Sequence, residues 1–90
     1  MRMKVKSAIL AGAAMLMAGT PALADVKAGV DAWSRGDYAT AVREWQSAAD
    51  KGDADAQFNL GQAYRMGRGV APDAKKAELY YAKAAGQGHL

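Results

Sequence analysis

The sequence predicts an all-α fold, a short α-solenoid of two antiparallel helix pairs preceded by a signal peptide. Three observations support this. Apolar and small residues recur three or four positions apart over residues 26–49 and 56–85, the period of helices with one buried face. Glycine and proline interrupt that period near residues 36, 52 and 67–72, and so divide it into helices. The second half repeats the pattern of the first, as expected of stacked repeats.

Residues 1–24 have the three parts of a secretory signal peptide. A basic start is followed by an apolar run over residues 8–18 and then by Ala22-Leu23-Ala24, the small-x-small pattern that precedes a cleavage site. The basic residues are Arg2, Lys4 and Lys6. The run is shorter than the roughly 20 apolar residues of a membrane span, so a retained anchor is the weaker alternative, and the absence of cysteine excludes a lipoprotein anchor. We therefore expect cleavage after Ala24 and a bacterial protein that is periplasmic or secreted, without a stable membrane anchor.

Removal of residues 1–24 leaves a chain whose formal net charge is zero. The full sequence has 12 Lys and Arg against 9 Asp and Glu, and residues 1–24 hold three of the basic residues and no acidic one. The mature chain is therefore balanced, and it has no basic stripe to neutralise phosphates. We expect no nucleic-acid partner.

Residues 25–52 are predicted to form the first helix pair. Val26, Val30 and Trp33 share one face of the first helix, where Gly29 and Ala32 leave room for close packing. Gly36-Asp37 marks a tight turn with an N-cap. The buried stripe of the second helix is predicted to be Ala41, Val42, Trp45, Ala48 and Ala49.

Residues 53–88 are predicted to form the second pair, with Asp53 and Asp73 as N-caps and a loop marked by Gly67, Gly69 and Pro72. Gly86 and Gly88 end the last helix. Gly61 lies in mid-helix, where glycine costs about 1 kcal/mol relative to alanine. We therefore expect a close helix crossing there, against the ring of Trp45 or Tyr81.

The second pair resembles the Sel1-like repeat, a longer-looped relative of the tetratricopeptide repeat. The pattern AxxxLGxxYxxGxGVxxDxxKAxxYYxKAAxQG carries the resemblance, through positions such as Leu60, Gly61, Tyr64, Gly67, Gly69, Asp73, Ala77, Tyr81 and Gly88. The first pair is closer to a plain tetratricopeptide repeat, and residues 89–90 are the stub of a possible next unit. The resemblance implies a right-handed solenoid that binds protein or peptide partners.

In such arrays the first helix of each unit lines the concave groove. The resemblance therefore implies that one outward face of this helix forms the partner-binding groove, made of Phe58, Asn59, Gln62 and Arg65. An ordinary solvated face is the alternative. The aromatic residues Trp33, Trp45, Tyr64, Tyr80 and Tyr81 fit core positions better than a ligand cage.

No residue pattern supports catalysis, a cofactor or a metal. An EF-hand loop begun at Asp53 would need glycine where Phe58 stands and glutamate where Tyr64 stands. Gly67-Arg68-Gly69 follows a helix, unlike a dinucleotide-binding loop. His89 is next to the last residue, and Ser34 and Ser47 have no sequence cue for activation.

The sequence thus predicts a non-catalytic protein–protein interaction module, an exported adaptor or regulatory scaffold of the bacterial cell envelope. The alternatives are an exported enzyme such as a β-lactam hydrolase, suggested by cysteine-rich relatives of the repeat, and the N-terminal fragment of a larger repeat protein. We also expect self-association through the last helix, because Leu79, Tyr80, Tyr81 and Ala84 form an apolar flank with no following repeat to cover it.

Overall fold

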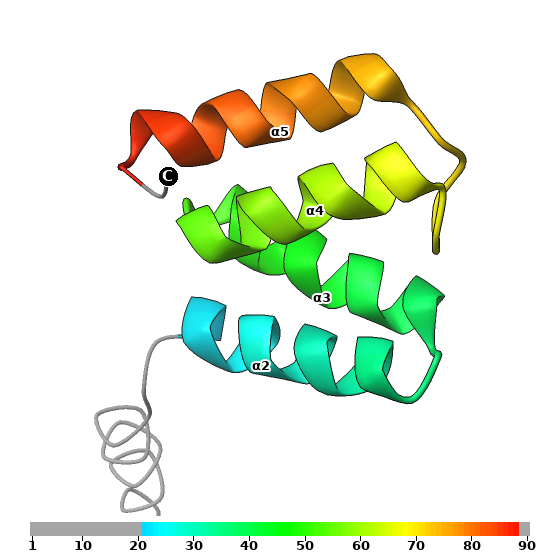
Figure 1. The fold of residues 1–90 in the computed structure, drawn as a ribbon. Helices are drawn as coiled ribbons and strands as arrows, with labels where there is room; N and C mark the ends of the chain where they lie inside the picture. The colour runs from blue at the N-terminus through cyan, green and yellow to red at the C-terminus, as the bar shows by residue number, and fades with distance from the viewer. Residues whose placement is uncertain (1–20, 89–90) are drawn as a thin grey trace, which may run out of the picture.

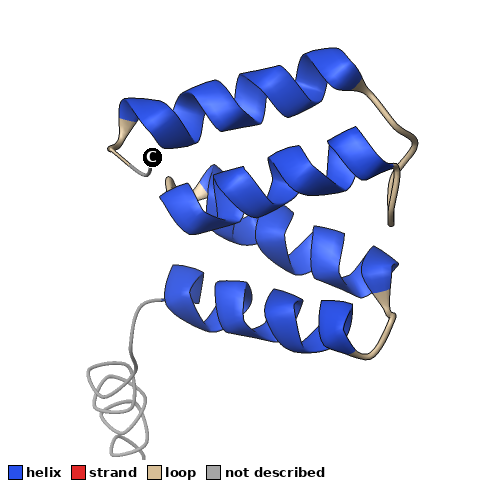
Figure 2. Ribbon diagram, in the orientation of Figure 1, coloured by secondary structure: helices blue, strands red, loops and turns tan. Residues whose placement is uncertain are grey.

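The computed structural model describes residues 21–88, and within them every regular element is a helix. These helices are α2 (Pro21–Ser34), α3 (Tyr38–Asp50), α4 (Ala54–Met66) and α5 (Ala74–Gly86). They stack in chain order, with α3 packed between α2 and α4, and α5 closing the far side (Figure 1). Short loops join them (Figure 2). The predicted all-α class is confirmed.

The predicted aspartate caps define where three helices begin. Asp37, Asp53 and Asp73 each accept a hydrogen bond from the backbone N–H three residues on, at 3.3, 2.9 and 3.0 Å. Each bond satisfies one of the N–H groups that the first turn leaves without a helical partner. The end of α4 is marked by Gly67, which adopts φ 71° in the left-handed region that favours glycine. These signals are local, and the sequence is sufficient to predict them.

The core consists mostly of alanines packed around three larger residues, Val42, Trp45 and Leu60. The predicted stripe of α3 is buried in full: Ala41, Val42, Trp45, Ala48 and Ala49. On α2 one prediction is wrong, because Val30 is 46% exposed. Val30 lies at the edge of the face shared by Val26 and Trp33, so the helix turns it away from α3.

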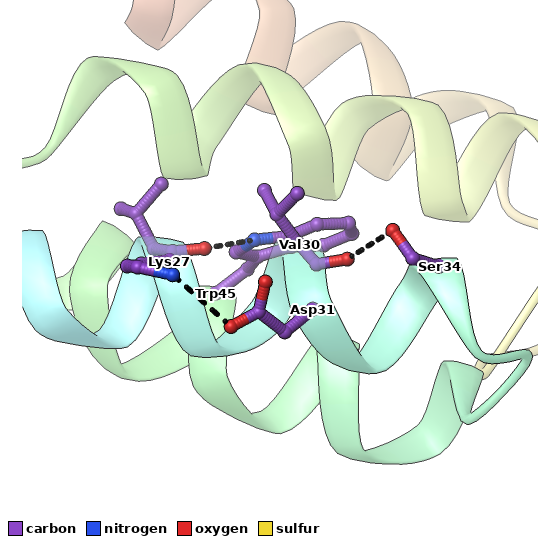
Figure 3. Close-up of polar contacts among 6 residues, drawn as sticks. Lys27, Val30, Asp31, Ser34 and Trp45 are labelled. Carbon is purple, nitrogen blue, oxygen red and sulfur yellow. Dashed lines mark hydrogen bonds and ion pairs between the residues drawn. The ribbon is translucent and has the colours of Figure 1, made fainter.

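The two helices of each pair approach each other closely at a glycine, which lies against an aromatic ring of the other helix. A Cβ on Gly61 would lie 2.7 Å from Cδ1 and Cε1 of Tyr81, and one on Gly29 would overlap the indole of Trp45. The predicted close crossing at Gly61 is confirmed, and its partner is Tyr81. Trp45 is fixed further because its Nε1 donates to the Val26 carbonyl at 3.3 Å (Figure 3).

The loop after α4 fastens the second pair to the first. Arg68 donates to the Tyr38 hydroxyl at 3.2 Å, and its guanidinium lies 5.2 Å from the centre of the same ring. Gly69, at φ 78°, approaches the Tyr38 carbonyl closely, and Val70 packs against the core. The loop therefore has a structural role, which agrees with the prediction that Gly67-Arg68-Gly69 is an interhelix loop.

The predicted signal peptide lies mostly outside the described residues, which begin at Pro21. Helix α2 begins there, so it includes the predicted cleavage site after Ala24. Asp25, the expected first residue of the mature chain, accepts hydrogen bonds from Lys51 Nζ and Ser47 Oγ, both at 2.9 Å. Within residues 21–88, no helix has the length and apolar character needed to cross a membrane.

The expected open flank of α5 is smaller than the sequence indicates. Leu79 is 51% exposed, but Ala84 is fully buried, and Tyr80 packs against the core with its ring stacked 5.8 Å from that of Tyr64. Tyr81 is half-buried against Gly61. The expectation was wrong for these three residues because positions 77, 80, 81 and 84 share the inward face of the helix, whereas position 79 lies on the other side.

Candidate partner-binding surface on α4

The predicted groove residues all lie on α4, on the face turned away from α3. Gln62 and Arg65 are exposed, and Phe58 and Asn59 are half-buried. The opposite face of the helix holds Ala56, Leu60 and Ala63, which are fully buried in the core. This division follows from helical spacing, because positions 58, 62 and 65 fall one turn apart on the same side.

A shallow hollow of about 170 Å³ opens on this face, and its lining residues are Gln62, Arg65, Met66 and Tyr81. Two of the predicted residues therefore line it. Met66, which is 48% exposed, was not predicted, although it lies one turn after Gln62 and helical spacing would have found it. Tyr81 comes from α5, and its place was predicted only as core. We call these four residues the α4 hollow.

The other two predicted residues do not line the hollow. The ring of Phe58 packs against that of Tyr81, with centroids 5.4 Å apart and the planes at 50°. Phe58 therefore fixes the ring that forms one wall of the hollow. Asn59 is half-buried and does not line it. The structure thus brings Phe58, Gln62 and Arg65 together around Tyr81, with Asn59 at the side.

Gln57 supports this surface from behind and was missed by the sequence analysis. Its side chain is 6% exposed. Its Nε2 donates to the Ala49 carbonyl at 3.4 Å, and its Oε1 accepts from Gln87 Nε2 at 2.7 Å. A buried amide satisfied from two other elements ties the start of α4 to the ends of α3 and α5. The outward face of α4 is therefore held in place by contacts with both neighbouring helices.

The charge on this face is concentrated at Arg65. Within residues 21–88 its guanidinium has no hydrogen bond or ion pair. Most other cations within residues 21–88 interact with a hydroxyl, a carboxylate or an aromatic ring: Lys27, Arg43, Lys51, Arg68, Lys76 and Lys83.

Within residues 21–88, the two carboxyl groups with a lowered pKa lie away from this face of α4. Hydrogen bonds from Lys51 and then Ser47 lower the pKa of Asp25, and hydrogen bonds from Thr40 lower that of Asp37.

The described residues offer no arrangement for metal binding, since no three of their His, Cys, Asp and Glu side chains gather to hold an ion. The two serines within residues 21–88 donate their hydroxyls to structural partners. Ser34 Oγ donates to the Val30 carbonyl at 3.0 Å, and Ser47 Oγ donates to Asp25 (Figure 3 shows the first). His89 lies outside the described residues. What α4 presents is a surface with polar donors beside apolar side chains.

Helix pairs that stack in chain order, each in contact with the next, are the arrangement of helical-repeat proteins. Residues 54–89 match the family model described as Sel1 repeat, so this part of the chain is a Sel1 repeat and the predicted resemblance is confirmed. This match covers α4, α5 and the loop between them, and so includes the α4 hollow.

Two curated relatives match parts of the chain. The alginate biosynthesis protein AlgK of Pseudomonas aeruginosa is 39% identical over 77 residues, which are 86% of this chain and 16% of AlgK. The DAP3-binding cell death enhancer 1 of Rattus norvegicus is 46% identical over 44 residues, 49% of this chain and 9% of that protein. The chain thus spans less than a fifth of either relative. No solved structure matches it significantly.

Proposed function

We propose that this chain is a non-catalytic protein-interaction module, exported to the bacterial cell envelope, where it acts as an adaptor or regulatory scaffold. The observation that carries the proposal is the α4 hollow, in which Arg65 and Gln62 stand beside Met66 and Tyr81 on a rigid helix pair. Exposed donors next to exposed apolar side chains are typical of surfaces that bind peptides or helices.

The family supports this reading. Sel1 repeats generally mediate protein–protein interaction. One of the relatives is named for binding a protein, DAP3. The envelope location rests on the signal-peptide features of residues 1–24, with cleavage after Ala24 leaving a mature chain that begins at Asp25.

A pull-down tests the proposal. The protein expressed from the full sequence, purified from the periplasm with a C-terminal tag, is the bait in an envelope extract, and captured proteins are identified by mass spectrometry. Gln62→Ala with Arg65→Ala should reduce capture while helicity and melting stay nearly unchanged, because both side chains are exposed. The matched control is Lys75→Ala, an exposed residue of α5 away from the hollow. Equal capture by the double variant and wild type would contradict the assigned face.

Self-association through α5 is a second mode of interaction that one observation favours. Leu79 is a large apolar residue left 51% exposed on the outer face of the last helix. Contact between two such faces would cover it. The area available is modest, because Tyr80, Tyr81 and Ala84 pack inside the fold.

The alternative of a β-lactam hydrolase has a direct assay. Nitrocefin turnover by the purified protein would contradict the non-catalytic proposal. We expect none. Ser34 Oγ donates to a backbone carbonyl, which cannot take up its proton, and the carboxylate that accepts from Ser47 Oγ is Asp25, a weak base because hydrogen bonds from Lys51 and Ser47 lower its pKa.

A further inference from the structure

We propose that the α4 hollow binds a peptide segment in which an acidic residue stands beside a large apolar one, the carboxylate pairing with Arg65 and the apolar side chain covering Met66 and Tyr81. This inference rests on the proposed function and names the chemistry of its partner. It follows from the charge, the polar atoms and the apolar surface at one place on the molecule.

The positive charge at the hollow belongs to Arg65. Arg65 is exposed at the rim of the hollow, and within residues 21–88 no carboxylate pairs with it. The guanidinium has donors only, in a planar fork that matches a carboxylate. By contrast, Arg68 in the neighbouring loop is occupied by the ring and the hydroxyl of Tyr38. Arg65 is therefore the guanidinium of this unit that remains available to a ligand.

The polar atoms of the hollow add to the same preference. Within the described part of the chain, neither the Gln62 amide nor the Tyr81 hydroxyl makes a hydrogen bond. Each can donate to a second carboxylate oxygen or to the backbone of a bound peptide. Among residues 21–88, no acidic side chain lines the hollow. A carboxylate is thus favoured over an ammonium group there.

The apolar part of the surface lies next to these donors. Met66 is 48% exposed, and the Tyr81 ring is extended by Phe58, with centroids 5.4 Å apart. Methionine is flexible and fits side chains of different shape. A leucine, methionine or phenylalanine adjacent to the acidic residue would reach this surface while the carboxylate stays at Arg65.

Selection from a random phage-displayed peptide library tests this. The protein expressed from the full sequence and immobilised through a C-terminal tag should enrich peptides with Asp or Glu next to a large apolar residue. Arg65→Glu should lose that enrichment, and Lys75→Glu, with the same change in net charge on a surface outside the hollow, should keep it. Circular dichroism checks that both variants remain helical.

A second measurement uses a fluorescein-labelled peptide from the wild-type selection. Its Kd should rise roughly tenfold with Arg65→Ala, equivalent to about 1.4 kcal/mol. For the wild-type protein the Kd should also rise with salt, because salt screens the pair between Arg65 and the carboxylate. Tyr81→Phe, which keeps the ring, should weaken binding less. Selected peptides without an acidic residue, or peptides that bind Arg65→Glu equally well, would overturn this inference and leave the proposed function standing. Failure to select any peptide would overturn the inference, and an unreduced pull-down by the Gln62 and Arg65 variant would overturn the assigned face.

Discussion

Replacing Gly61 with alanine should destabilise the protein, although alanine is the better helix former. The residue is buried in mid-helix, and the added Cβ would lie 2.7 Å from two carbons of the Tyr81 ring. Carbon atoms prefer a separation of about 3.5–4.0 Å, so the ring has to retreat by roughly 0.8 Å. The Tyr81 ring packs against the ring of Phe58, which restricts this shift of the Tyr81 ring.

The magnitude follows from two opposed terms. The exchange gains about 1 kcal/mol of helix propensity and costs about 1–3 kcal/mol of overpacking. The net loss is therefore about 1 kcal/mol, which lowers the melting temperature by about 4–8 °C in a domain of this size. Gly61→Leu adds more atoms at the same place and should cost about 1–3 kcal/mol in total.

Thermal and urea melts followed by circular dichroism measure both effects. Gly86→Ala is the matched control, since its Cβ would meet nothing within 4 Å, and its melting temperature should be unchanged or higher. In a Tyr81→Ala background the sign at Gly61 should reverse, because only the propensity gain remains. A Gly61→Ala protein that melts as high as Gly86→Ala would refute the close crossing.

Three further predictions concern processing, pH and assembly. Mass spectrometry of the periplasmic fraction should find a chain that begins at Asp25, and an intact chain in the membrane would contradict cleavage after Ala24. Folding lowers the pKa of Asp25 and Asp37, so their stabilisation is fully present above the unfolded value of about 4 and is lost as pH falls from there through the lower folded value. The melting temperature should therefore be flat from neutral pH to about 5 and then drop. Asp37→Asn should flatten that drop, and an unaltered acid profile would show that the cap charge is unimportant. The melting temperature and sedimentation should depend on concentration over about a hundredfold range, and Leu79→Lys should remove the dependence; a clean monomer with a constant melt would exclude self-association.

The fold could be predicted because its signals are short-range. The aspartate caps lie three residues from the N–H groups they satisfy, and Gly61 stands out because a mid-helix glycine has a cost that only close packing explains. The buried stripe of α3 follows from helical spacing alone. Val30 was misplaced because a residue at the edge of a stripe can turn either way.

The site could be predicted only in part. Gln62 and Arg65 line the hollow, and they were predicted because the resemblance points to this helix and helical spacing separates its outward face from its core face. Tyr81 reaches the hollow from α5, which requires the crossing of the two helices to be known. Gln57 could not be found, since a glutamine in a helix is ordinarily exposed and its partner Gln87 is 30 positions away.

The measurement that tests the central claim most directly is photo-crosslinking in living cells. A photoreactive amino acid is placed in the full chain at Met66 in the α4 hollow, and separately at Leu79 on the outer face of α5, two sites of similar exposure. The account predicts that Met66 yields an adduct with another protein, and that Arg65→Ala weakens this adduct. An adduct from Leu79 alone, or a Met66 adduct that Arg65→Ala does not affect, would contradict the claim that α4 binds the partner.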